Sequence, residues 1–161
     1  MRVFLRAELD GPRQAFDEYE KLEMYPQEGW QMRTKSELLL FLGREEQARA
    51  SLRTVRSPFV LSQDWREFWE AMRQFDRRQL SDDAYLAKAG RSRWKQFHVH
   101  YQNGLFRLAE GDRAGARDHF QKAVGTRALW IYPWAWNKML LSRLEGDDKW
   151  PPWIPMNELG N

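Results

Sequence analysis

The three histidines are the side chains of this sequence best suited to bind a transition metal, because the chain contains no cysteine. They are His98, His100 and His119. His98 and His100 are two positions apart, so on one helix they point in different directions and cannot hold the same ion. We interpret the histidines as ordinary surface or packing residues, and we expect neither a metal nor another cofactor.

Carboxylates are the second group that could do chemistry, as a general acid and base. The acidic stretches include Glu18, Glu20, Glu23 and Glu45-Glu46. They are most simply solvated helix faces, although two carboxylates can also meet in space once a chain has folded. The sequence contains no nucleophile elbow, phosphate loop or dinucleotide fingerprint. We therefore expect a protein that is not an enzyme.

Arginines form a basic stripe at Arg49, Arg53 and Arg56, whose spacing places them on one helix face. A second basic group, Arg91, Arg93, Lys95 and Arg107, occurs beside the aromatic residues Trp94, Phe97 and Tyr101. Basic and aromatic side chains together suit single-stranded nucleic acid, because phosphates pair with the cations and bases stack on the rings. The net charge is only +3, so a solvated helix face is the simpler interpretation. Nucleic-acid binding remains the alternative function.

Tryptophan is concentrated near the C-terminus: the chain has nine, and five of them occur from Trp130 onward. Those that bear on function are Trp134, Trp136, Trp150 and Trp153. The segment that starts at Trp150 reads Trp-Pro-Pro-Trp-Ile-Pro, which is typical of an extended polyproline-type conformation. We predict that this segment docks onto the last helix through Trp134 and Trp136. A patch for a partner protein is the other interpretation, because Trp is enriched at binding hot spots.

These side chains must be positioned by helices, because residues that favour strands are scarce. Val, Ile and Thr make up 10 of the 161 residues, whereas good helix formers dominate. A content of 42% hydrophobic and 30% charged residues is typical of one globular domain of this length. The start is too charged for a signal peptide, and no stretch approaches the roughly 20 apolar residues of a membrane span. We expect a cytoplasmic all-α protein without membrane contact.

Hydrophobic periodicity, capping residues and glycines predict eight helices. They cover 12–25, 30–42, 45–56, a helix that starts after Ser62 and carries 65–75, a helix from Ser81 to Gly90, a helix that carries 94–108, and then 113–124 and 133–144.

A repeat with a period of about 34 residues runs through these helices. Ala15 and Ala48 are separated by one such period to within a residue, and Ala48 and Ala116 by two. The turn glycines Gly43 and Gly111 are also two periods apart. A unit of two helices and a turn cannot bury its apolar faces alone, so we expect several units to stack into a helical solenoid.

With this spacing the sequence resembles the tetratricopeptide repeat family of helix–turn–helix units. One unit matches the family pattern at Ser36, Leu39, Gly43, Ala48, Leu52 and Val55, and another matches it at Gly104, Gly111, Ala116, Phe120 and Ala123. A unit near 62–90 is degenerate, with Arg77 at the expected turn glycine. The Trp/Pro-rich ending is similar to the endings of uncharacterised bacterial repeat proteins.

The resemblance implies an α–α superhelix, a right-handed solenoid of about four hairpins plus a C-terminal helix, over residues 1–146. In its first unit, Ala15, Tyr19 and Leu22 match the second helix, and the first helix is a short one around residues 2–9. A Trp/Pro-rich tail follows over residues 147–161. The implied function is that of a scaffold or adaptor, which binds a peptide or helix of another protein on a concave surface. A larger assembly and a homo-oligomer are both compatible with it. By the family's geometry the groove-facing residues are Trp30, Arg33, Glu37, Glu67, His98 and Tyr101.

Overall fold

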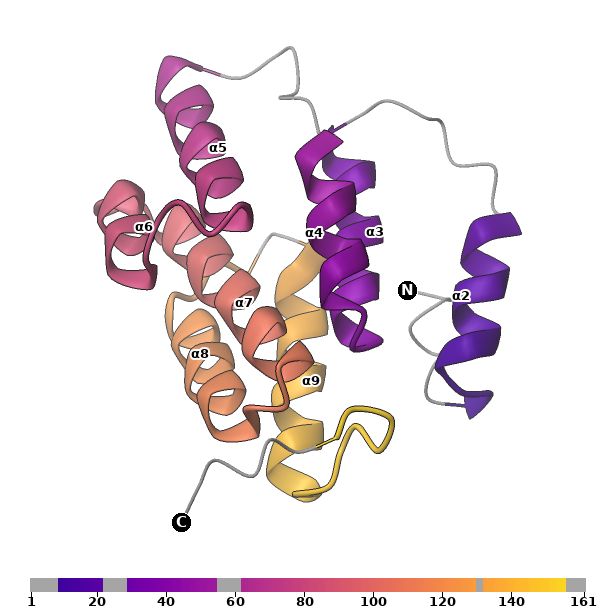
Figure 1. The fold of residues 1–161 in the computed structure, drawn as a ribbon. Coiled ribbons are helices and arrows are strands. Elements are labelled where there is room, and N and C mark those ends of the chain that lie inside the picture. The colour runs from indigo at the N-terminus through magenta and orange to yellow at the C-terminus, as the bar shows by residue number, and fades with distance from the viewer. Residues whose placement is uncertain (1–8, 22–28, 55–61, 130–131, 156–161) are drawn as a thin grey trace.

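The structure is a computed structural model that describes residues 9–21, 29–54, 62–129 and 132–155 (Figure 1). All regular elements in these ranges are α-helices and none is a strand, which confirms the all-α prediction. None of these described helices combines the length and the apolar character that crossing a bilayer requires. The helices are α2 (Pro12–Lys21), α3 (Gly29–Phe41), α4 (Glu45–Thr54), α5 (Gln63–Asp76), α6 (Asp82–Ala89), α7 (Arg93–Ala109), α8 (Arg113–Gly125) and α9 (Tyr132–Gly146).

Several helices begin at a side chain that accepts a hydrogen bond from a free backbone N–H group of the first turn. Ser62 and Ser81, both expected at helix starts, accept from the N–H three residues further on. Ser92 caps α7 and Asp112 caps α8 in the same way. The predicted helix ends at 25 and 56 lie outside the described residues, where α2 and α4 are described only to Lys21 and Thr54.

Two close-packed hairpins, α3–α4 and α7–α8, form the framework of the fold. Where α7 crosses α8, the ring of Phe120 lies directly against the backbone of Gly104, and a methyl group at residue 104 would overlap it. Helix α9 joins the second hairpin, because the Asn137 side chain donates a hydrogen bond to the backbone oxygen of Phe120 over 3.0 Å. Helices α5 and α6 lie between the two hairpins in the sequence, and α5 packs against α4 and α6 against α7.

Three helices end in the same hydrogen-bonding pattern. At Gly43, Arg78 and Gly111 the backbone N–H donates to the carbonyl three residues back, and the next N–H donates to the carbonyl five residues back. This Schellman arrangement requires positive φ, and φ is 71°, 58° and 81° at these residues. The expectation that Arg77 occupies the middle turn position is therefore wrong by one residue, because the unit between the first two turns is one position longer than a strict repeat.

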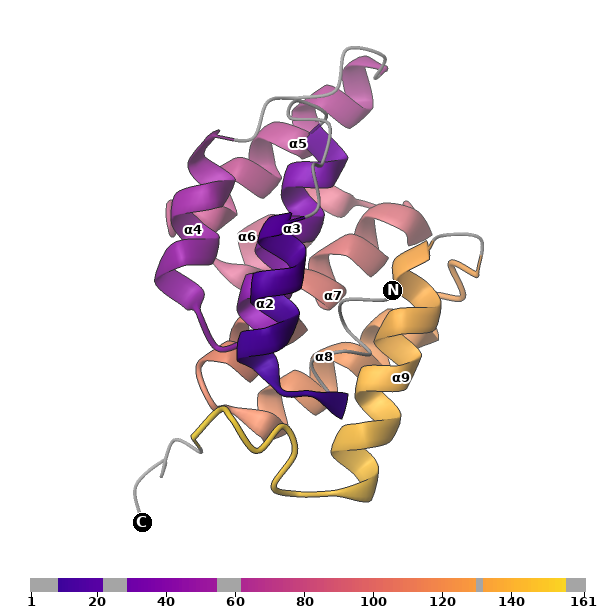
Figure 2. The same cartoon turned by 90° about the vertical axis from the view of Figure 1, so that its right-hand side faces the viewer.

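The first helices of the hairpins meet one another in the described part of the chain. Helix α3 packs against α7, and the ring of Phe41 in α3 lies 5.8 Å from that of Trp136 in α9. Helix α2 passes in front of α3 in the view of Figure 2, and its Phe16 ring is 4.1 Å from the guanidinium of Arg44, in the turn between α3 and α4. The inner surface that the resemblance implies to be open is thus filled, between α3, α7 and α9, by this chain's own side chains.

Candidate interaction site at the hairpin turns

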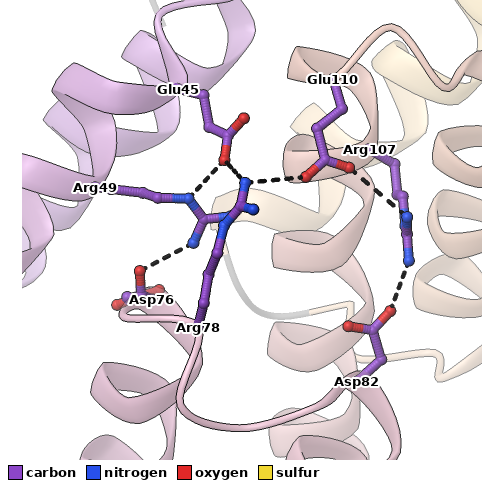
Figure 3. Close-up of polar contacts among 7 residues, drawn as sticks. All are labelled: Glu45, Arg49, Asp76, Arg78, Asp82, Arg107 and Glu110. Atoms are coloured by element: carbon purple, nitrogen blue, oxygen red, sulfur yellow. Dashed lines mark hydrogen bonds and ion pairs between the residues drawn. The ribbon is translucent and has the colours of Figure 1, made fainter. Parts of the chain in front are cut away.

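Six charged side chains of alternating sign cross the molecule where the three turns come together (Figure 3). We call this set the ionic chain; it consists of Arg49, Glu45, Arg78, Glu110, Arg107 and Asp82. Glu45 Oε1 lies 2.6 Å from Nε of Arg49 and 2.5 Å from Nη2 of Arg78. The first turn and the middle turn are therefore joined through one carboxylate oxygen.

The second half of the ionic chain joins the middle turn to the third. Nη2 of Arg78 also lies 3.7 Å from Oε1 of Glu110, the residue that ends α7. Arg107 is 3.7 Å from the other oxygen of Glu110 and 3.1 Å from Oδ2 of Asp82. These contacts link α4, the α5–α6 turn, the start of α6 and the end of α7, which are distant in the sequence.

Two adjoining hollows open along the ionic chain. The first, of about 390 Å³, lies between the α5–α6 turn and α7, and its lining includes Arg78, Asp82, Phe106, Arg107 and Glu110. The second, of about 540 Å³, follows α4 and is lined by Glu45, Glu46, Arg49, Ala50, Arg53, Asp76, Arg77 and Arg78. Arg49 and Arg78 line both hollows, so the two form one continuous charged depression.

The two glutamates of the ionic chain titrate differently because their surroundings differ. Partial burial acts to raise the pKa of Glu45, but hydrogen bonds from Arg49 and Arg78 outweigh it and hold the pKa below its usual value. At Glu110, burial and then repulsion from Glu45 raise the pKa, and the nearby arginines offset this only in part. Glu110 is therefore the more weakly held of the two negative charges.

The predicted arginine stripe divides into one engaged residue and one exposed residue. The guanidinium of Arg49 lies 4.0 Å over the ring of Phe106 and donates to the backbone oxygen of Asp76 over 2.9 Å. Because Arg49 also pairs with Glu45, its charge is largely neutralised within the fold. Arg53 is exposed, and Arg56 lies outside the described residues.

Four of the six predicted groove residues converge, but in the interior between α3, α5 and α7. Arg33 is 5% exposed and lies 3.3 Å from Asp76, while Tyr101 is 2% exposed and donates to Glu37 over 3.4 Å. His98 is partly buried on the same side of α7. The structure therefore places Arg33 and Tyr101 away from an open surface, because α3 packs directly onto α7.

This interior cluster has unusual titration. Burial raises the pKa of Glu37 to about 7, against the opposing pull of Arg33 and the hydrogen bond from Tyr101. Burial and then the positive charge of Arg33 lower the pKa of His98 to about 3, so that ring is neutral at physiological pH. Hydrogen bonds between helices hold the cluster together. Neither hollow is lined by the four predicted residues Arg33, Glu37, His98 and Tyr101.

Asp76, Gln102 and Tyr85 complete the cluster, and the sequence analysis did not single them out. Asp76 accepts hydrogen bonds from Arg33 and from the Gln102 amide, whose oxygen accepts from the Tyr85 hydroxyl over 3.0 Å. Asp76 is 43 residues from Arg33, so their pairing had no local signal. Arg33 and Asp76 each compensate the cost of burying the other's charge, because they form an ion pair with a hydrogen bond.

The other two predicted groove residues do not join this cluster in the described structure. Glu67 is exposed on α5 and accepts a hydrogen bond from Gln63 of the same helix over 2.9 Å. Trp30 lies in α3, but its side chain is outside what the structure describes.

The C-terminal tail lies against the helices as far as Pro155. Trp150 and Trp153 both contact the ring of Phe41, at 5.8 Å and 5.2 Å between ring centres, and Trp153 Nε1 donates to the Phe41 backbone oxygen over 2.9 Å. The tail therefore meets α3 at Phe41. Trp136 contacts the same Phe41 ring, whereas Trp134 packs beside Lys138 on α9.

Arg113 holds this tail, although the sequence analysis assigned it no role. Its guanidinium is 8% exposed and donates to four backbone oxygens of the tail. Those oxygens belong to Lys149, Trp150, Pro151 and Ile154, at 2.7 to 3.3 Å. A single cation facing four carbonyls fixes the path of an irregular segment that has no helix or strand to satisfy its backbone.

The histidines do not come together as a three-ligand site. The rings of His100 and His119 are 5.7 Å apart between centres. Burial, and then the neighbouring His119, lower the pKa of His100 to about 4. No group of three or more His, Asp or Glu side chains suited to a metal ion occurs among the residues that the structure describes.

Fold and site together define an all-α helical protein with a charged depression at its hairpin turns. Comparison with protein-family models, with curated proteins and with solved structures gives no match. The function of the chain must therefore be inferred from the geometry of the site itself.

Proposed function

We propose that this chain is a non-enzymatic protein–protein interaction module, a scaffold or adaptor built from stacked tetratricopeptide-like hairpins. The observation that carries the proposal is the pair of adjoining hollows, lined by charged side chains from three successive hairpins. Hollows of this size can accept several side chains of a partner. Since α3 contacts both α7 and α9, we expect the partner at the row of turns rather than on a concave surface.

The solenoid part of this proposal is supported by the equivalence of the turns. Gly43, Arg78 and Gly111 end α3, α5 and α7, the first helices of successive hairpins, with the same hydrogen bonds. Ala48 and Ala116, at matching places in α4 and α8, are both fully buried. A stack of similar hairpins repeats such positions, because each unit must pack against its neighbour in the same way.

The test is to express the tagged full chain in cells of its source and to measure the mass and composition of what is purified with it. The variant Ala50→Trp would fill the hollow along α4, where Ala50 is exposed and lines the wall. The matched control is Ala87→Trp, because Ala87 is exposed on α6 and lines neither hollow. We expect a protein partner at fixed stoichiometry that A50W loses and A87W retains.

Other outcomes of this experiment have separate meanings. Purification of the chain as a monomer with nothing bound, even after cross-linking in the cells, would contradict the function. A second copy of the chain as the only partner would establish a homo-oligomer instead of an adaptor. A stoichiometric protein partner that both variants retain would support the function and place its site elsewhere.

Nucleic-acid binding by the arginine stripe is the alternative function, and the exposure of Arg53 favours it. Binding of this kind would weaken steeply as salt is raised, because it releases counterions from the phosphate backbone. Nuclease-sensitive material in the same purification would identify it.

A further inference from the structure

We propose that the hollow along α4 binds an acidic segment, rich in Asp and Glu, of a partner protein, and that Arg53, Arg77 and Arg78 contact its carboxylates. This inference rests on the proposed function, since it names the chemistry of the partner at that site. The three arginines come from the second half of α4 and from the α5–α6 turn, and all three line the hollow.

The charge balance of the hollow favours an anionic ligand. The carboxylate of Asp76 faces inward and pairs with the buried Arg33, which leaves Glu45 and Glu46 as the negative groups of the lining. Four arginines face these two glutamates, a surplus of two positive charges. Arg53 and Arg77 are exposed, and neither side chain has a partner among the described residues.

Arg78 occupies a position where glycine would be easier to accommodate. Its φ of 58° costs a residue with a Cβ roughly 1–2 kcal/mol, and the equivalent turn residues, Gly43 and Gly111, avoid that cost. The Arg78 side chain is 64% exposed and uses only Nη2 in its contacts with Glu45 and Glu110. Since Arg78 lines both hollows, its remaining N–H groups are open to a ligand in the shared depression. A strained residue whose donors face an open hollow indicates a binding role.

The spacing of the charges favours a polypeptide over a nucleic acid. Glu45, Glu46 and Glu110 are interleaved with the arginines, so a continuous phosphate backbone would meet negative charges along its path. A peptide can place carboxylates opposite the arginines and neutral residues opposite the glutamates. The arginines of the ionic chain already pair with carboxylates at 2.5 to 3.7 Å, so arginine side chains of the hollows can bind a carboxylate group.

The test measures binding of a fluorescent peptide of alternating Glu and Gly to the full chain by anisotropy at low salt. The site variant is R53Q/R77Q/R78G. The control variant, R91Q/R93Q/R127G, loses the same charge from exposed arginines outside both hollows. It also places glycine at Arg127, whose φ is 55°. We expect about tenfold weaker binding for the site variant and an unchanged dissociation constant for the control.

Three results would overturn the inference. They are no binding of the peptide by the wild-type chain, equal weakening in both variants, and tighter binding of a single-stranded oligonucleotide of equal charge. Equal weakening would mean that only net charge matters. A stoichiometric cellular partner that R53Q/R77Q/R78G binds as well as the wild-type chain does would support the proposed function and contradict this binding site. Failure of this inference is therefore distinguishable from failure of the proposed function.

Discussion

The ring of Phe120 in α8 occupies the space where a side chain of residue 104 in α7 would lie. Phe120 is fully buried, and a Cβ on Gly104 would overlap the ring. The close approach of α7 and α8 therefore depends on the absence of one side chain and the presence of another.

We expect Gly104→Ala to destabilise the protein by about 1–3 kcal/mol, because the added methyl group forces Phe120 out of a packed position. Combining it with Phe120→Leu should restore part of that loss, since Leu is smaller and can move away from the methyl group. The measurement is urea unfolding of the two single variants and the double variant. Strictly additive free energies would contradict the contact.

Substitutions of Arg78 separate backbone strain from ion pairing. R78A keeps the positive φ and loses the contacts with Glu45 and Glu110, whereas R78G loses the contacts but relieves the strain. We expect R78G to be more stable than R78A by about 1 kcal/mol, and to be within about 1 kcal/mol of wild type because exposed ion pairs contribute little. Thermal unfolding by circular dichroism measures this. A loss above about 2 kcal/mol in R78G would show the ionic chain to be structural.

Replacement of Arg113 should release the tail. Met keeps the apolar stem of the side chain, but removes the guanidinium that donates to four backbone oxygens of the tail. We expect R113M to cost about 3 kcal/mol and to shift tryptophan fluorescence to longer wavelength as Trp150 and Trp153 become hydrated. Arg127→Met, at an exposed arginine, is the control. An unchanged spectrum in R113M would mean that the aromatic contacts with Phe41 hold the tail alone.

The stability of the protein should fall as pH rises from about 4.5 to about 7, through the titration of Glu37. Its pKa is raised to about 7 in the folded state, so the folded protein retains a proton that the unfolded chain releases at lower pH. At acidic pH the retained proton stabilises the folded protein relative to the unfolded chain. This stabilisation is lost as pH rises through the folded pKa of Glu37. The loss is on the order of 3 kcal/mol.

Glu37→Gln should remove this dependence, because glutamine can accept the Tyr101 hydrogen bond and does not titrate. Unfolding free energies of wild type and E37Q, measured from pH 5 to pH 8, should therefore diverge as pH rises, with E37Q the more stable at the upper end. Arg33 and Asp76, which also face Glu37, are present in both proteins. Parallel pH profiles would contradict the assignment.

Most of the fold could be predicted because its signals are local. Capping residues such as Ser62 and Ser81, the Gly43 and Gly111 turns, and the apolar periodicity all act within a few residues of the helices they define. A strict period of about 34 residues places the middle turn at Arg77. The turn is at Arg78, because the unit that follows Gly43 is one residue longer than that period. No local property of Arg78 marks it as a residue with positive φ.

The candidate site could be predicted only in part, because its contacts join distant segments. The arginine stripe on α4 was found, but its partner Phe106 lies on α7 and engages Arg49. That Arg33 and Tyr101 face the same region was implied by the resemblance to the tetratricopeptide repeat family. Their burial was not, since it depends on how closely α3 approaches α7. The role of Arg113 required knowledge of where the tail passes.

The contact between Trp153 and Phe41 also has a consequence for the order of events during synthesis. The two residues are 112 positions apart. At about 5–20 residues per second, a ribosome adds Trp153 roughly 6 to 22 seconds after Phe41. Throughout that interval the end of α3 lacks the indole rings that cover it in the finished fold. The nascent chain therefore presents an apolar surface to chaperones and to other nascent chains, and that surface closes only after α9 and the tail have emerged.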